Sequence, residues 1–122
     1  MILEYYKKAQ ADQFTFIPIP QVILTDERFS EVSMEAKVLY GMLLKRMSLS
    51  TANRWIDEKK RAYLVYPVYK IQEDIGISKG KSVSCLQELE MVGLIERIHR
   101  GQGLPSIIYL KNFIIEEQSS EV

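Results

Sequence analysis

Five polar residues gather at the start of one predicted helix, residues 78–92, and their types are suited to binding an anion. They are Ser78, Lys79, Lys81, Ser82 and Ser84. The lysines are flexible cations and the serines donate hydrogen bonds, while the first helical turn adds unpaired N–H groups and partial positive charge. Ser82 also shares a helical face with Leu86, which turns it toward a core. Because this helix holds no arginine or asparagine, contact with phosphate is favoured over strong base readout.

A predicted hairpin follows the helix and carries a second polar group at its tip. Leu94–His99 and Ser106–Phe113 are β-rich, and the loop between them holds two glycines and a proline, which is typical of a hairpin tip. His99, Arg100 and Gln102 stand in or beside this loop. Arginine at such a tip can enter a minor groove or meet a phosphate. Two alternatives stay open: the lysines form only a solvated face, or the hairpin contacts a protein.

Local signals position the helix and the hairpin. Pro67 suits the start of a helix over residues 68–75, and Gly76 can take the left-handed conformation that ends it. Ser78 is then a natural N-cap for the next helix, which ends near Gly93. Helix, turn, helix, strand, hairpin, strand is the order of a winged helix-turn-helix, an α+β fold with a β-hairpin wing over residues 97–107.

The first half of the chain supplies the rest of the predicted core. Ser33 is a candidate N-cap for a helix over residues 33–48, whose apolar residues recur at helical spacing. A polar connection over residues 49–60 follows, in which Trp55 is expected to pin the loop to the core. Residues 61–66 read as a strand, and residues 22–29 as a short helical turn. Two prolines make residues 14–20 an extended arm or edge strand.

Length and composition indicate one domain and exclude several classes of protein. We expect residues 1–20 to form an N-terminal arm, 21–115 the winged-helix domain, and 116–122 a tail or the start of a linker. No apolar run approaches a membrane span, and no secretory signal is evident, so a cytoplasmic protein is expected. The formal net charge is zero, but residues 76–111 hold five basic residues against three acidic ones. A local basic surface is therefore compatible with the neutral total.

Enzyme chemistry is not indicated. Cys85 and His99 are the only residues of their types, so neither a cysteine-based metal site nor a Ser–His–Asp arrangement is expected. Cys85 falls in the predicted second helix, where a small, partly buried side chain is typical. The acidic pairs 57–58 and 73–74 are of the kind that solvent usually covers. No metal and no cofactor is predicted.

Longer stretches resemble a known family. Four stretches follow one another in the chain: FIPIPQVIL, VSMEAKVLYGMLLKRMSLS, NRWIDEKKRAYLVYP and IGISKGKSVSCLQELEMVGLIERIHRGQGLPSIIYLKNF. This succession resembles the N-terminal domain of plasmid replication initiators of the RepA N-terminal family. The resemblance covers residues 14–113, and its helix–wing half alone is shared by many winged-helix regulators.

The resemblance implies binding to double-stranded origin repeats, usually as a homodimer, with the N-terminal arm and the first strand able to take part in dimerisation. It also implies a separate C-terminal domain that recruits replication-machinery proteins. Residue by residue, it assigns the following DNA contacts, of which the first four lie on the helix and the others in the wing: Lys79, Lys81, Ser82, Ser84, Arg97, Arg100, Gln102 and Lys111.

Two other functions share this fold. One is a winged helix used for protein contact, as a dimerising or primosome-scaffolding module, which the neutral charge and the aromatic arm favour. The other is a transcriptional regulator, whose resemblance does not extend to the first half of this chain. Salt separates DNA binding from an apolar protein interface, because only the first weakens steeply as salt rises.

Overall fold

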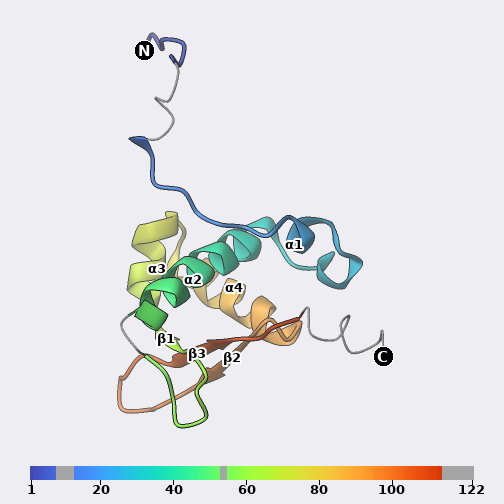
Figure 1. Cartoon of the computed structure of the whole chain (residues 1–122), viewed down its shortest axis with the longest axis vertical. Helices are drawn as coiled ribbons and strands as arrows, with labels where there is room; N and C mark the ends of the chain where they lie inside the picture. The colour runs from blue at the N-terminus through green and yellow to red at the C-terminus, as the bar shows by residue number, and fades with distance from the viewer. Residues whose placement is uncertain (8–12, 53–54, 114–122) are drawn as a thin grey trace.

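The computed structural model describes residues 1–7, 13–52 and 55–113, and places helices over one face of a small sheet (Figure 1). The predicted tail, residues 116–122, lies outside these ranges. In chain order the elements are α1 (Gln21–Thr25), the 3-10 helix η2 (Glu27–Phe29), α2 (Met34–Ala52), β1 (Leu64–Val65), α3 (Val68–Ile75), α4 (Lys79–Met91), β2 (Ile95–Ile98) and β3 (Ile107–Leu110). From α2 onward this is the winged-helix order, so the predicted fold class is confirmed.

The three strands form an antiparallel sheet with β3 in the middle, in the order β1-β3-β2. Strand β3 pairs with β2 from Ile95↔Leu110 to Ile98↔Ile107, and with β1 at Leu64↔Ile108. The loop that joins β2 to β3 therefore extends beyond the Ile98↔Ile107 pair, and this loop is the wing tip. The opposite end of the hairpin, at Leu110, lies beside the C-terminal end of α4.

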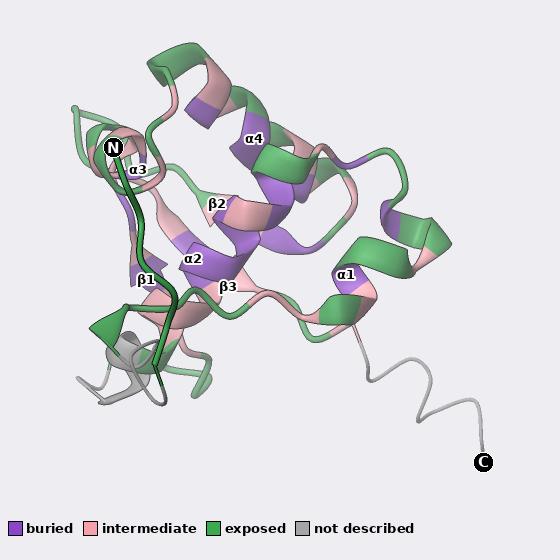
Figure 2. Cartoon of the chain, turned by 90° about the horizontal axis from the view of Figure 1, so that it is seen from above, coloured by how far each residue is buried: buried purple, intermediate pink, exposed green. Residues whose placement is uncertain are grey.

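The core lies where α2 and α4 pack against each other and onto the inner face of the sheet (Figure 2). Apolar side chains from every layer are fully buried there: Leu39, Leu43, Leu64, Ile71, Leu89, Leu94 and Ile108. Cys85 is fully buried as well, which exceeds the partial burial expected for it. Helix α4 is thus held by packing along one side, and its other side is free to face a ligand.

The chain before α1 crosses helix α2 at Gly41. A Cβ atom added to Gly41 would lie 2.7 Å from Ile19 Cγ1, 2.8 Å from Ile17 Cγ2 and 2.8 Å from the carbonyl oxygen of Pro18. Such distances are well inside van der Waals contact, so the close crossing requires glycine. This explains why a residue that weakens helices stands inside α2.

Gly41→Ala is expected to destabilise the domain by about 1–3 kcal/mol, because the added methyl group forces residues 17–19 away from α2. Gly80→Ala is the matched control, since a Cβ at Gly80 of α4 meets nothing within 4 Å. That substitution should leave stability unchanged or raise it slightly. Urea unfolding of the two variants measures the difference, and equal midpoints would show that the crossing tolerates a side chain.

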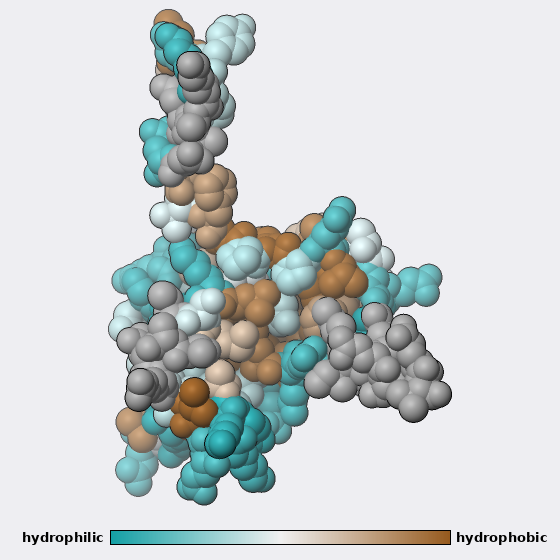
Figure 3. Space-filling model, in the orientation of Figure 1, coloured by the Kyte–Doolittle hydropathy of each residue, from teal (hydrophilic) through white to brown (hydrophobic). Residues whose placement is uncertain are grey.

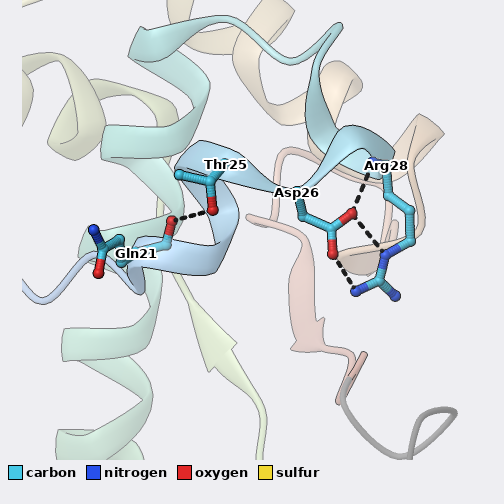
Figure 4. A network of polar contacts seen from close by, with 4 residues as sticks. All are labelled: Gln21, Thr25, Asp26 and Arg28. Carbon is cyan, nitrogen blue, oxygen red and sulfur yellow. Dashed lines mark hydrogen bonds and ion pairs between the residues drawn. The ribbon is translucent and has the colours of Figure 1, made fainter.

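Asp26 fixes the turn between α1 and η2 (Figure 4). Its Oδ1 accepts the backbone N–H of Arg28 at 2.9 Å, and the guanidinium of Arg28 donates to both carboxylate oxygens at 3.1 and 2.8 Å. These bonds hold the pKa of Asp26 below its usual value. The same guanidinium lies 5.6 Å from the ring of Phe113, so η2 is tied to the residues that follow β3.

Three expectations about the first half need correction. A polar connection is expected from residue 49, but helix α2 continues to Ala52. The Leu-Ser-Thr-Ala stretch is compatible with a helix once the preceding turns are packed. Strand β1 covers Leu64–Val65 only, not residues 61–66. Trp55 does not pin its loop to the core, since 41% of it is exposed.

The shortened strand has a physical cause, which is a turn built on Asp57. Oδ1 of Asp57 accepts the backbone N–H groups of Lys59 and Arg61 at 2.9 and 2.8 Å, and Oδ2 accepts from Arg61 Nε and from the Tyr109 hydroxyl. The hydrogen bonds, led by the backbone N–H of Arg61, lower the pKa of Asp57 to about 2. Residues 57–61 therefore curl into a turn instead of continuing along β3.

Candidate nucleic-acid interface

The turn between α3 and α4 has the predicted geometry. Gly76 adopts φ 75° and ψ 37°, and its N–H donates to the Gln72 carbonyl at 2.9 Å, which ends α3. Ser78 is the N-cap of α4, because its Oγ accepts the N–H of Lys81 at 3.1 Å. The first turn of α4 is exposed at Lys79 and Gly80, so its unpaired N–H groups can face an anion.

Ser82 does not belong to the exposed surface. It is fully buried, and its hydroxyl donates to the Ser78 carbonyl at 2.8 Å. It shares the buried side of α4 with Cys85, Leu86 and Leu89. The expected contact between Ser82 and DNA is incompatible with this position, because helical spacing sets its direction more strongly than its polar side chain does.

The opposite side of α4 presents a stripe of exposed residues at helical spacing: Gly80, Ser84, Gln87 and Met91. We refer to these four residues as the outer stripe. Ser84 was expected to face out, and the structure places it at the centre of this side. Gln87 is not among the DNA contacts predicted from residue type. Its spacing of seven residues from Gly80, which is two helical turns, indicates that it lies on the same side of the helix. A glutamine side chain can donate and accept hydrogen bonds at once.

Gly80 adds a second feature of the outer stripe. Glycine in a helix costs up to about 1 kcal/mol relative to alanine. No neighbour in the described part of the chain requires glycine at this position, because a Cβ atom added to Gly80 would meet nothing within 4 Å. The absence of a side chain leaves the first turn of α4 accessible to the close approach of another molecule.

Two carboxylates join α4 to the start of α2. Glu88 accepts both the N–H and the hydroxyl of Ser33, at 2.7 and 2.9 Å, and so caps α2 from the neighbouring helix. Ser33 Oγ also accepts the N–H of Ala36 at 3.2 Å, which confirms Ser33 as the N-cap of α2. Lys81 Nζ lies 3.6 Å from Glu35 Oε2 in the first turn of α2. The cation of Lys81 is therefore shared with a carboxylate at the edge of the candidate surface.

The wing tip lies beside the middle of α4. Leu104, Pro105 and Ser106 line one pocket of about 210 Å³ together with Leu86 of α4 and the residues that precede α3. Gly101, Gln102 and Gly103 all have positive φ, and Gln102 is exposed. Arg100 Nε donates to the Pro105 carbonyl at 2.8 Å across the loop, and His99 Nδ1 lies 3.0 Å from Ser106 Oγ. The tip thus has a defined shape and exposes Arg100 and Gln102.

Arg97 and Lys111 are not brought to this surface. The side chain of Arg97 is only 12% exposed, and its guanidinium donates to Glu90 Oε1 at 2.9 and 2.6 Å, which joins β2 to α4. Its expected role as a DNA contact is replaced by that of a link between helix and wing. Lys111 follows β3 at the end of the hairpin opposite the tip, where its N–H donates to the Leu94 carbonyl at 2.9 Å. Lys111 is exposed, but the length of the hairpin separates it from Arg100 at the tip.

The described residues offer no metal centre. Residues 1–7, 13–52 and 55–113 include no group of three His, Cys, Asp or Glu side chains arranged to hold a metal ion. No helix in this part of the chain is long and apolar enough to cross a bilayer. The exposed side chains of the α4 start, the outer stripe and the wing tip form the candidate interface.

A helix-turn-helix joined to a β-hairpin wing defines this chain as a winged-helix domain. It belongs to the family described as replication initiator protein A (RepA) N-terminus, whose model matches residues 15–122.

Individual relatives agree with this assignment. The chain is 29% identical to a solved structure described as "Structure of Rep-DNA complex", with a TM-score of 0.73 and 98% of each chain covered. It is also 29% identical to "N-Terminal domain of DNA binding protein", with a TM-score of 0.72 and coverage of 99% and 98%. For "Structure of MDR initiator" the identity is 26%, the TM-score 0.70 and the coverage 98% and 99%.

A curated relative is much longer. The chain is 23% identical over 111 residues to a "41 kDa protein" of Lactobacillus helveticus, and the match covers 86% of this chain but 31% of that protein. The chain thus spans about a third of the length of that relative.

Proposed function

We propose that this chain is the DNA-binding domain of a plasmid-type replication initiator, and that it binds double-stranded origin repeats through α4 and the wing. The observation that carries the proposal is the capped, exposed start of α4 in a helix-turn-helix, followed by a wing whose tip is also exposed. Lys79 and Lys81 supply cations at the α4 start and Arg100 supplies one at the wing tip, while Ser84 and Gln102 supply hydrogen-bonding groups. In helix-turn-helix proteins the second helix lies in the major groove. The similarity to a structure described as a Rep–DNA complex supports DNA binding by this chain.

The neutral total charge does not oppose the proposal, because the acidic residues near this surface are engaged within the protein. The Arg97 guanidinium offsets the charge of Glu90, while Glu88 keeps its charge but is directed toward Ser33 of α2. The other local carboxylates are Glu35, which lies beside Lys81, and Glu96 of β2. Phosphate contacts then come from the α4 start and the wing tip, and they fix the register of the protein on the duplex.

Fluorescence anisotropy tests the proposal directly. The chain is titrated onto a labelled duplex that carries the repeats nearest its own gene, and onto a scrambled duplex, at several salt concentrations. Contact with about four phosphates weakens binding roughly 150-fold for a fourfold rise in salt. Preference for the repeats, together with this steep dependence, is the expected result. Equal and weak binding to both duplexes, unaffected by salt, would contradict DNA binding as the function.

Glu35→Gln is expected to tighten binding to every duplex by about 2–5-fold, because Lys81 no longer shares its charge with a carboxylate. Glu27→Gln on η2 is the matched control, since it makes the same change in net charge at an exposed site on another element. The same anisotropy titration at low salt compares the two variants. An equal gain from both would show that overall charge, and not the release of Lys81, is responsible.

The N-terminal arm supports a second part of the proposal, which is assembly as a homodimer. Its apolar side chains are largely exposed: Met1, Ile2, Leu3, Tyr5, Tyr6, Phe14 and Phe16. Apolar side chains also gather over α1 and α2 on one face of the body (Figure 3). Exposed apolar groups of this extent favour a protein contact. Light scattering of the intact chain and of a chain lacking residues 1–13 tests whether the arm is needed for a dimer.

A function restricted to protein contact, as a dimerising or primosome-scaffolding module, is the competing proposal that the same arm supports. Recruitment of replication-machinery proteins is also part of the initiator proposal, as is location in the cytoplasm, where plasmid DNA replicates. A scaffold would retain its dimer and show no preference for the repeats. The anisotropy measurement separates the two functions, because both include a dimer and only the initiator prefers the repeats.

A further inference from the structure

We propose that Gln87 determines part of the sequence specificity, by reading an adenine in the major groove from the centre of the outer stripe. The inference rests on the proposed DNA-binding function and deepens it. Gln87 is exposed on the side of α4 opposite the buried residues Leu86 and Leu89. An amide side chain can bond adenine N6 and N7 with two parallel hydrogen bonds, which distinguishes adenine from the other bases.

The neighbours of Gln87 on the outer stripe favour this role. Gly80 and Ser84 precede it by seven and three residues, so all three lie along one line of the helix. The small side chains toward the N-terminus allow that end of α4 to approach the groove floor, while the longer amide of Gln87 spans the remaining gap. Lys79 and Lys81 lie to either side of this line, where the phosphate strands that border a major groove would run.

Contacts within the protein leave Gln87 available and hold its backbone still. The residue just beyond it, Glu88, is bonded to Ser33, and Glu90 is bonded to Arg97. These two bonds fix the rotation of α4 about its own axis relative to α2 and to the wing. A fixed rotation is what a residue needs in order to distinguish one base pair from another, because bidentate bonding tolerates little misalignment.

The test measures binding of the intact chain to duplexes in which each base pair of the repeat is changed singly. The wild-type chain is expected to lose about 10-fold in affinity at each base pair that it reads. Gln87→Ala should abolish that loss at one A·T pair of each repeat and preserve it at the other pairs. Gln87→Glu should shift the preference at the same pair toward C·G, because a carboxylate accepts from cytosine N4.

Gln21→Ala is the matched control, because it removes the same amide from α1, where Figure 4 shows the side chain pointing away from the neighbouring ion pair. It should reproduce the wild-type pattern. If Gln87→Ala kept the base-pair preferences of the wild-type chain, or weakened them equally at every base pair, the role of Gln87 would be wrong. The proposed function would still stand in that case. A wild-type chain that binds no duplex, or binds all of them equally, would overturn the proposed function and this inference together.

Discussion

Replacing Lys79 and Lys81 together by alanine is expected to weaken binding to the origin repeats by about 100-fold, roughly 10-fold for each phosphate that a lysine no longer binds. The weakening should be the same on repeat and scrambled duplexes, because phosphate contacts carry no sequence information. The slope of log affinity against log salt should also become shallower by about 0.9 for each of these phosphates. Anisotropy titrations over a range of salt concentrations give both quantities from one set of data.

The double variant Lys59→Ala, Lys60→Ala provides the control for this experiment. It removes two exposed cations from the turn that Asp57 organises, so the change in net charge is identical. That turn binds the Tyr109 hydroxyl from the face of the sheet that lies away from the buried Ile108. If the control weakened binding as much as the α4 variant, the location of the DNA-binding surface on α4 would be wrong.

Leu86→Ala is expected to destabilise the domain by about 2–5 kcal/mol, which is a large share of the stability of a small domain. Leu86 is 2% exposed and lines the 210 Å³ pocket beneath the wing tip. Truncation enlarges a space that already exists, and the surrounding β-hairpin and α3 cannot close it without disturbing their own packing. Urea unfolding followed by circular dichroism measures the destabilisation as a lower midpoint.

Met91→Ala on the same helix is the comparison for Leu86→Ala. Met91 is 87% exposed, so its truncation should change the free energy of unfolding by no more than about 0.5 kcal/mol. Similar destabilisation by both variants would mean that α4 is stabilised by its own helix propensity and not by packing. Leu86→Ala with an unchanged midpoint would contradict the assignment of the buried side of α4.

The parts of the fold that follow from local chemistry could be predicted from the sequence. Gly76 and Ser78 act on their immediate neighbours, through a left-handed backbone and a side-chain cap, so the turn before α4 is visible in the residues alone. The extent of β1 could not be predicted in the same way. It depends on the bond between Asp57 and Tyr109, which are 52 residues apart in the chain.

The candidate site shows the same division. Lys79 and Ser84 are exposed as expected, because a capped helix start is a local feature. The position of Arg97 depends on its ion pair with Glu90, which forms only once the wing folds back along α4. Gln87 differs from both, because residue type favours lysine and serine as DNA contacts, whereas helical spacing places Gln87 on the outer stripe without regard to charge.

Nuclear magnetic resonance can locate the DNA-binding surface most directly, by mapping the residues that respond to DNA. The isotope-labelled chain is titrated with the repeat duplex, and the amide chemical shifts are followed residue by residue. We expect the largest changes on residues 78–87 of α4 and residues 100–104 of the wing tip, with little change in the turn over residues 57–61. Changes centred on that turn, with α4 unaffected, would contradict the claim that α4 and the wing form the DNA-binding surface.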